Sequence, residues 1–222
     1  MKNMIKNGWR DVTINEYIDL CNIINDNGQT EYNREVAKIA LLANMDEEQV
    51  WSLNINQFRN YQVQFLWTNE FKINEKVMFK TISINGQKYE VDPNLQNFTV
   101  AQYIDFQTFY PQLKKDNTII GNILACFIIP DGKKYAEGYD IKELVNTINN
   151  HLDIMTAQEI LFFFLKNYLI SIRVLANYFN WIVKRKTRKL KDKTQAEKMT
   201  IQWENTKQNI LDGLNWLTKL DN

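Results

Sequence analysis

The sequence predicts a mainly α-helical protein, in which two related helical halves are linked by a central β-hairpin and followed by a C-terminal arm of long helices. Three observations predict this fold class. Residues 12–20 (VTINEYIDL) recur in nearly the same form at residues 98–106 (FTVAQYIDF). Residues 77–91 alternate apolar and polar side chains around an Asn-Gly pair. A strongly apolar stretch at residues 159–183 then runs directly into a basic one.

The composition is that of a folded chain with no dominant charge. Of 222 residues, 45% are hydrophobic and 13% aromatic, with only 7 Gly and 3 Pro, so a substantial core is expected. The 27 basic and 26 acidic side chains nearly cancel, which excludes a global field that would recruit nucleic acid or an anionic membrane. Cys21 and Cys126 each lie in an apolar run, which favours buried small side chains over a disulfide or a metal site.

The repeated stretch predicts the start of a helix in each half. Thr13 is followed three residues later by Glu16, and Thr99 is followed three residues later by Gln102. This is the spacing of a capping box, in which the hydroxyl and the longer side chain each satisfy a backbone N–H of the first turn. Both stretches then place apolar side chains at helical spacing, Ile14, Tyr17, Ile18 and Cys21 in the first and Val100, Tyr103 and Ile104, followed by Gln107, in the second.

The segments that follow each copy occur in the same order, which indicates an internal duplication. Residues 34–45 (REVAKIALLANM) correspond to residues 119–129 (IIGNILACFII), and both read as helices. In the second half a further helix is expected to begin at a capping box formed by Thr156 and Glu159.

A β-hairpin is expected between the halves. Asn85 and Gly86 stand between the two alternating runs, and this pair is typical of a type I′ turn. Because an isolated hairpin is marginal in water, it either packs on the helices or adds to a strand of another subunit.

The apolar stretch at residues 159–183 has the length of a membrane span but carries Lys166 and Arg173 near its centre. Cations at that depth cost about 2.5–3.5 kcal/mol each, so no membrane span is predicted. A long helix, buried except for one polar stripe, is expected instead.

A basic block follows this helix. We interpret it as a partner-binding site, and its candidate residues are Lys184, Arg185, Lys186, Arg188, Lys189 and Lys191. A solvated helix end, an acidic protein surface and the DNA backbone are the alternatives for what surrounds it. A last helix completes the arm, so the expected organisation is a helical half at 1–72, a hairpin at 73–93, a second half at 94–183 and a basic segment with its helix at 184–222.

No catalytic motif accompanies this framework. His151 is the single histidine and has no nucleophile in a recognisable motif, and phosphate-binding glycine patterns are absent. The loop at residues 129–140 (IPDGKKYAEGYD) has two lysines and two glycines, but a Pro-Asp-Gly turn joining two helices needs no ligand. The prediction is therefore a protein without enzymatic activity, cofactor or metal.

Three stretches carry a resemblance to a known group of proteins. Residues 9–20 (WRDVTINEYIDL), 84–91 (INGQKYEV) and 127–141 (FIIPDGKKYAEGYDI) resemble structural or assembly proteins of tailed bacteriophages of Bacteroides-type hosts, including crAss-like phages. The resemblance extends to about Lys186, and the C-terminal segment from Lys184 onward does not share it.

The resemblance implies a virion structural protein, a homo-oligomeric ring component of the portal and tail assembly. A tail assembly chaperone and a nucleic-acid-binding accessory protein are the alternatives. The implied partners are copies of the chain itself and other phage portal or tail proteins, with a non-specific contact to the DNA backbone as a further alternative. The implied location is the tail or head-tail region of the virion, and the host cytoplasm during assembly.

Overall fold

The computed structural model describes residues 5–72, 79–92, 97–113, 115–168 and 181. The chain divides into two compact units, Met1–Phe163 and Phe164–Asn222. The fold described below is that of the first unit. Most of the predicted arm, including the whole basic block, lies outside the described residues.

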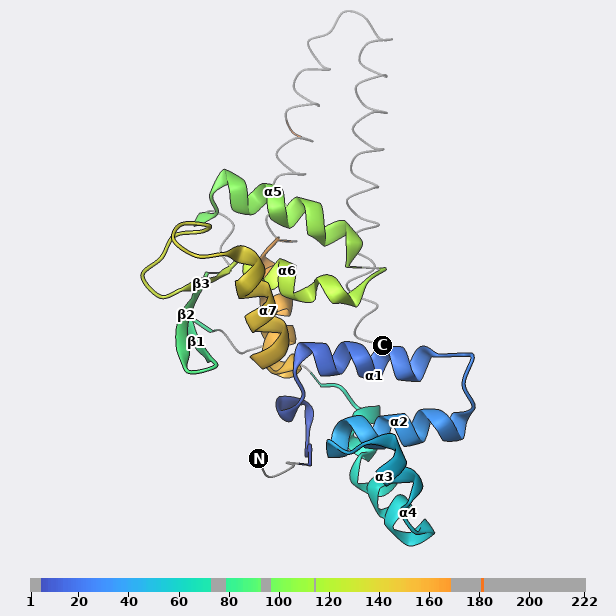
Figure 1. The fold of residues 1–222 in the computed structure, drawn as a ribbon. Helices are drawn as coiled ribbons and strands as arrows, with labels where there is room; N and C mark the ends of the chain where they lie inside the picture. The colour runs from blue at the N-terminus through green and yellow to red at the C-terminus, as the bar shows by residue number, and fades with distance from the viewer. Residues whose placement is uncertain (1–4, 73–78, 93–96, 114, 169–180, 182–222) are drawn as a thin grey trace, which may run out of the picture. The chain divides into compact units, whose positions relative to one another are not determined.

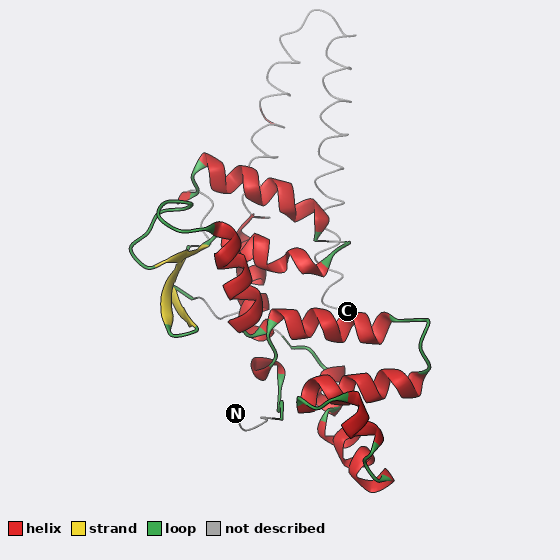
Figure 2. Cartoon of the chain, viewed as in Figure 1, coloured by secondary structure: helices red, strands yellow, loops and turns green. Residues whose placement is uncertain are grey.

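The first unit is built mainly of helices (Figures 1 and 2), so the prediction of a mainly α-helical protein is confirmed. Its N-terminal part contains a 3-10 turn, η1, four α-helices and a further 3-10 turn, η2. Their bounds are Trp9–Asp11 for η1, Ile14–Asn25 for α1, Glu31–Ala43 for α2, Glu47–Trp51 for α3, Ile55–Gln64 for α4 and Leu66–Asn69 for η2. The later part contains α5 at Val100–Phe109, α6 at Ile120–Ala125 and α7 at Ile141–His151, and residues 154–163 are also helical.

The described strands form one small antiparallel sheet in the order β1-β2-β3. Strand β1 (Thr81–Ile84) pairs with β2 (Gln87–Val91) across Asn85 and Gly86, whose φ angles of 49° and 77° suit a type I′ turn. Strand β3 (Ile128–Pro130) pairs with the other edge of β2.

Strand β3 corrects the sequence analysis, which assigned residues 119–129 to a helix. Helix α6 ends at Ala125, and the chain then turns so that Glu90 pairs with Ile129. The Pro-Asp-Gly turn therefore joins a strand to α7, not two helices. A short apolar run is compatible with a buried helix or with a strand. Here it forms a strand because the backbone groups at the free edge of β2 pair with it.

Both predicted capping boxes of the repeated stretch are present. The Thr13 hydroxyl accepts from the Glu16 N–H at 3.3 Å, and the Glu16 carboxylate accepts from the Thr13 N–H at 2.8 Å. The corresponding distances for Thr99 and Gln102 are 3.2 Å and 2.8 Å. Each cap begins its helix where the sequence places it.

The third predicted box, at Thr156 and Glu159, is wrong. The helix begins at residue 154, and Asp153 accepts from the Thr156 N–H at 2.8 Å, so Asp153 is the cap and Thr156 lies inside the first turn. A backbone bridge between Thr13 and Asp153 explains the earlier start, because it holds Asp153 in the extended conformation that a cap requires.

The same bridge ties the two ends of the unit together. The Ile154 N–H donates to the Val12 carbonyl at 2.8 Å, and the Ile14 N–H donates to the Leu152 carbonyl at 3.2 Å. Helix α1 consequently lies against α7 as well as α2. The core around this junction includes the fully buried side chains Val12, Ile14, Ile39, Ile148 and Ile154.

The two copies of the repeated stretch bury different faces. Helix α1 buries Ile14 and Ile18, whereas α5 leaves Val100 77% and Ile104 57% exposed. Helix α5 buries Phe106 and Gln102 instead, and the Gln102 side-chain amide donates to the Cys126 carbonyl at 2.9 Å. Val100 and Ile104 therefore lie on the exposed side of α5.

No helix among the described residues is long and apolar enough to cross a membrane. Most of the stretch at 159–183 for which a span was considered lies outside those residues.

Helices α6 and α7 approach each other closely at Gly121. A Cβ built on Gly121 would lie 2.1 Å from Oδ1 of Asn149, a buried oxygen without a hydrogen-bond donor among the described residues. The absence of a side chain at position 121 therefore sets the distance between these helices.

We expect Gly121→Ala to destabilise the protein by about 1–3 kcal/mol, because the new methyl group must displace Asn149 in a packed interface. In an Asn149→Ala background the same change should instead stabilise by up to about 1 kcal/mol, through the helix propensity of alanine. Urea unfolding of the four variants measures both effects.

Gly8→Ala is the matched control, because a Cβ there meets no atom within 4 Å. The close approach would be disproved if Gly121→Ala cost the same free energy with and without the Asn149 side chain.

Candidate protein-interaction site

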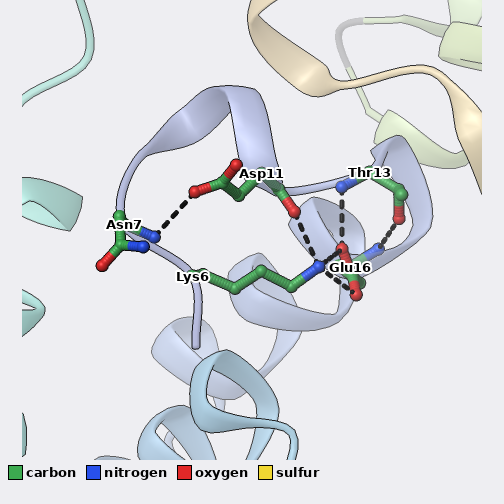
Figure 3. Close-up of polar contacts among 5 residues, drawn as sticks. All are labelled: Lys6, Asn7, Asp11, Thr13 and Glu16. Carbon is green, nitrogen blue, oxygen red and sulfur yellow. Dashed lines mark hydrogen bonds and ion pairs between the residues drawn. The ribbon is translucent and has the colours of Figure 1, made fainter. Parts of the chain in front are cut away.

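A polar cluster holds the N-terminal segment against the first turn of α1 (Figure 3). The Lys6 ammonium donates to Glu16 at 3.0 Å and to the Asp11 carbonyl at 2.6 Å. The Asn7 N–H donates to the Asp11 carboxylate at 2.8 Å. Glu16 therefore serves both its capping box and this ion pair. Each of these contacts is satisfied within the chain, so the cluster is structural.

A second ion pair anchors η1 to the helix at residues 154–163. The Arg10 guanidinium donates to both carboxylate oxygens of Glu159, at 2.9 and 3.0 Å, and to the Thr156 hydroxyl at 3.1 Å. The Glu159 side chain is 1% exposed, whereas that of Arg10 is 58% exposed. A buried carboxylate needs a paired charge, and Arg10 supplies it. The predicted cap residues Thr156 and Glu159 are thus partners of Arg10.

An aromatic cluster lies beside these anchors. The Trp9 ring is 5.0 Å from that of Trp67 and 4.9 Å from that of Phe71, in edge-on arrangements, and its Nε1 donates to the Glu70 carbonyl at 2.7 Å. A cavity of about 430 Å³ adjoins Trp9 and Trp67, with Met155 on its wall. The Trp67 Nε1 is buried without an acceptor among the described residues.

The two thiols are not set up for catalysis. Burial raises the pKa of the Cys126 thiol to about 12 and also raises that of Cys21. Tyr135 donates to Asp105 at 2.6 Å, and burial raises the pKa of its hydroxyl group. Over the described part of the chain, no group of His, Cys, Asp and Glu side chains is arranged to hold a metal ion.

The remaining candidates are exposed apolar surfaces, of which two stand out. The first, the α5 face, consists of Val100, Tyr103 and Ile104, at 77%, 49% and 57% exposure. These positions have the i, i+3, i+4 spacing that places side chains on one side of a helix. The neighbouring side chains of Ala101 and Thr108 are also exposed, and neither is charged.

The second surface, the α2–α4 patch, consists of Tyr32, Trp51 and Ile55, each at least half exposed. The Tyr32 ring lies 5.3 Å from the ring of Trp51 and stacks at 5.3 Å on Phe58, which is buried. The patch is thus an ordered aromatic surface supported from below. Exposed apolar clusters of this kind are typical of protein-binding sites.

Three acidic side chains lie near Tyr32 and Trp51 of the α2–α4 patch. Glu47 and Glu48 lie four and three residues before Trp51 in α3, on the same side of that helix, and Glu31 precedes Tyr32 in α2. All three glutamates are exposed, and none forms an ion pair with another described residue. We call these three residues the acidic rim.

The structure places the predicted site residues in three groups. Thr13, Glu16, Thr99 and Gln102 form caps, and Asn85 and Gly86 form the turn between β1 and β2. Thr156 and Glu159 bind Arg10. Lys184, Arg185, Lys186, Arg188, Lys189 and Lys191 lie outside the described residues.

Neither the α2–α4 patch nor the role of Arg10 was predicted from the sequence. Trp51 and Ile55 flank a short loop between two helices, and their spacing alone does not distinguish a buried side chain from an exposed one.

Comparisons of the chain with protein-family models, with curated proteins and with solved structures find no match.

We expect Arg10→Ala to lower the free energy of unfolding by about 1–3 kcal/mol, because the buried Glu159 carboxylate loses its charged partner. Adding Glu159→Gln should recover part of this loss, since a neutral amide costs less to bury than a carboxylate. Chemical denaturation of each variant measures the differences.

Arg59→Ala, at an exposed position of α4, is the control and should stay within about 0.5 kcal/mol of the wild type. An Arg10→Ala effect as small as that of the control would contradict the anchoring role.

Stability should fall as the pH rises through the alkaline range. The Cys126 pKa is raised from 9.0 to about 12, so the folded state holds the thiol neutral and this contribution is complete below pH 9. It is lost as the pH increases from 9 towards 12, because the unfolded chain releases the proton first. Cys126→Ala should therefore flatten the decline of unfolding free energy measured between pH 8 and pH 11. An identical slope in both proteins would refute this linkage.

Proposed function

We propose that the chain is a non-enzymatic structural protein of the virion of a tailed bacteriophage, acting as a homo-oligomeric ring component of the portal and tail assembly. The phage setting comes from the resemblance at residues 9–20, 84–91 and 127–141. The proposed partners are further copies of the chain and neighbouring portal or tail proteins. The proposed location is the tail or head-tail region of the virion, and the host cytoplasm during assembly.

The observation that carries this proposal is the pair of exposed apolar surfaces on one unit. The α5 face and the α2–α4 patch come from different helices of the first unit. A ring subunit contacts a neighbour on each side through two different surfaces, and this arrangement supplies two. Both surfaces are ordered by buried contacts beneath them, Gln102 under the α5 face and Phe58 under the α2–α4 patch.

The proposal predicts that purified virions contain the chain in a fixed stoichiometric ratio to the portal protein. Quantitative mass spectrometry of the particles measures this ratio, and a tail reconstruction should show a closed ring of this chain. An Ile104→Lys variant, which charges the α5 face, should be incorporated at a reduced level, whereas Asn22→Lys, at an exposed position of α1 outside both surfaces, should not change incorporation.

Absence of the chain from mature particles would overturn the ring function. If the chain also bound tail components before maturation, a tail assembly chaperone would be the better assignment. Retention in particles that depends on packaged DNA would instead favour the nucleic-acid-binding alternative.

A further inference from the structure

We infer that the α2–α4 patch of one copy binds the basic segment at residues 184–193 of a second copy. The inference deepens the proposed function and rests on its homo-oligomeric part. It gives a partner to the α2–α4 patch, which is exposed in the first unit. It also gives a partner to the basic segment, for which the sequence allows several alternatives.

The two surfaces have opposite charge. Residues 26–59, which contain the whole patch and its rim, carry six acidic and three basic side chains, so their net charge is −3. Lys38 pairs with Glu35, and Arg34 donates to the Asp26 carbonyl at 3.2 Å. Residues 184–193 carry seven basic side chains and one acidic one. The acidic rim therefore has uncompensated charge, and this chain contains a segment of the opposite sign.

The aromatic surface favours the same occupant. Arg and Lys side chains bind the faces of Trp and Tyr rings, and their aliphatic parts cover apolar surface. Tyr32 and Trp51 are half exposed, with Glu47 and Glu48 one turn away from Trp51. A basic segment would thus find a ring face and a carboxylate within one helical turn. A purely apolar partner would leave the rim glutamates buried without partners.

A contact of this kind can run from head to tail. The patch and the basic segment are different parts of the chain, so each copy can offer one of them to each neighbour, whereas a two-fold dimer would exchange both contacts reciprocally. Such heterologous contacts close into a ring when the rotation between copies permits. A two-fold contact between two patches is disfavoured, because it would bring the acidic rims of both copies together.

Charge reversal in full-length protein tests the inference. One variant, Glu47→Lys with Glu48→Lys, reverses the rim, and another, Lys184→Glu with Arg185→Glu, Lys186→Glu and Arg188→Glu, reverses the segment. Sedimentation at low and moderate salt should show self-association of the wild type that weakens with added salt. Each variant alone should associate at least about tenfold more weakly, because like charges now face each other.

An equal mixture of the two variants should associate again, because a reversed rim meets a reversed segment and a native rim meets a native segment. Asp19→Lys with Glu90→Lys is the matched control: it changes the net charge as the rim variant does, at exposed positions outside the patch, and should leave association unchanged. Trp51→Ala should weaken association without altering its salt dependence.

A wild-type protein that stays monomeric at about 100 μM, where a Kd of 10 μM would give mostly associated chains, overturns the inference. The inference is also overturned if association survives both reversals, or if the two variants do not associate when mixed. The partner of the basic segment would then be another part of the same chain or DNA. If virions contain the chain in a fixed ratio but the free protein stays monomeric, this contact is rejected and the ring function is not. If the mixed variants associate again but virions lack the chain, the ring function is rejected and this contact is not.

Discussion

The ion pair between Arg10 and Glu159 is the interaction on which the rest of the first unit depends. It joins η1 to the helix at residues 154–163, and the backbone bridge between Thr13 and Asp153 continues the same junction. Because the Glu159 carboxylate is buried, its burial is favourable only while Arg10 stays in place. The start of α1 is held at this junction, and α2 packs on α1. The position of the N-terminal helices is therefore set by a contact between residues almost 150 positions apart.

This junction explains why the aromatic residues of the N-terminal part divide into two groups. Trp9 stands next to Arg10, is buried, and packs with the partly buried rings of Trp67 and Phe71. Tyr32 and Trp51 lie on helices further along the chain, and they remain half exposed. Leaving large aromatic side chains in water forgoes about 1.5–3 kcal/mol of burial each. A partner that covered these side chains would recover this free energy, so the surface is suited to binding. The acidic rim favours a basic partner.

The repeated stretch shows how one local pattern serves two different roles. Thr13 and Thr99 cap their helices in the same way, because a capping box involves only atoms within one turn. Ile14 and Ile18 are buried in α1, whereas their counterparts Val100 and Ile104 are exposed in α5. Leu20 and its counterpart Phe106 are buried in both helices. Gln102 takes the place of Glu16 in the box, and its side-chain amide also donates to the Cys126 carbonyl. The same local pattern thus begins two helices whose exposed sides differ.

The sequence by itself determined the features that depend on neighbouring residues: the mainly helical class, the helix starts at Thr13 and Thr99, and the turn at Asn85 and Gly86. Tertiary structure decided the features that depend on distant residues. Asp153 replaced Thr156 as a cap because of its bridge to Thr13, and residues 128–130 became a strand because β2 offered an edge. The exposure of Trp51 and of the α5 face was likewise decided by packing, because helical spacing specifies which side chains share a face but not whether another element covers it.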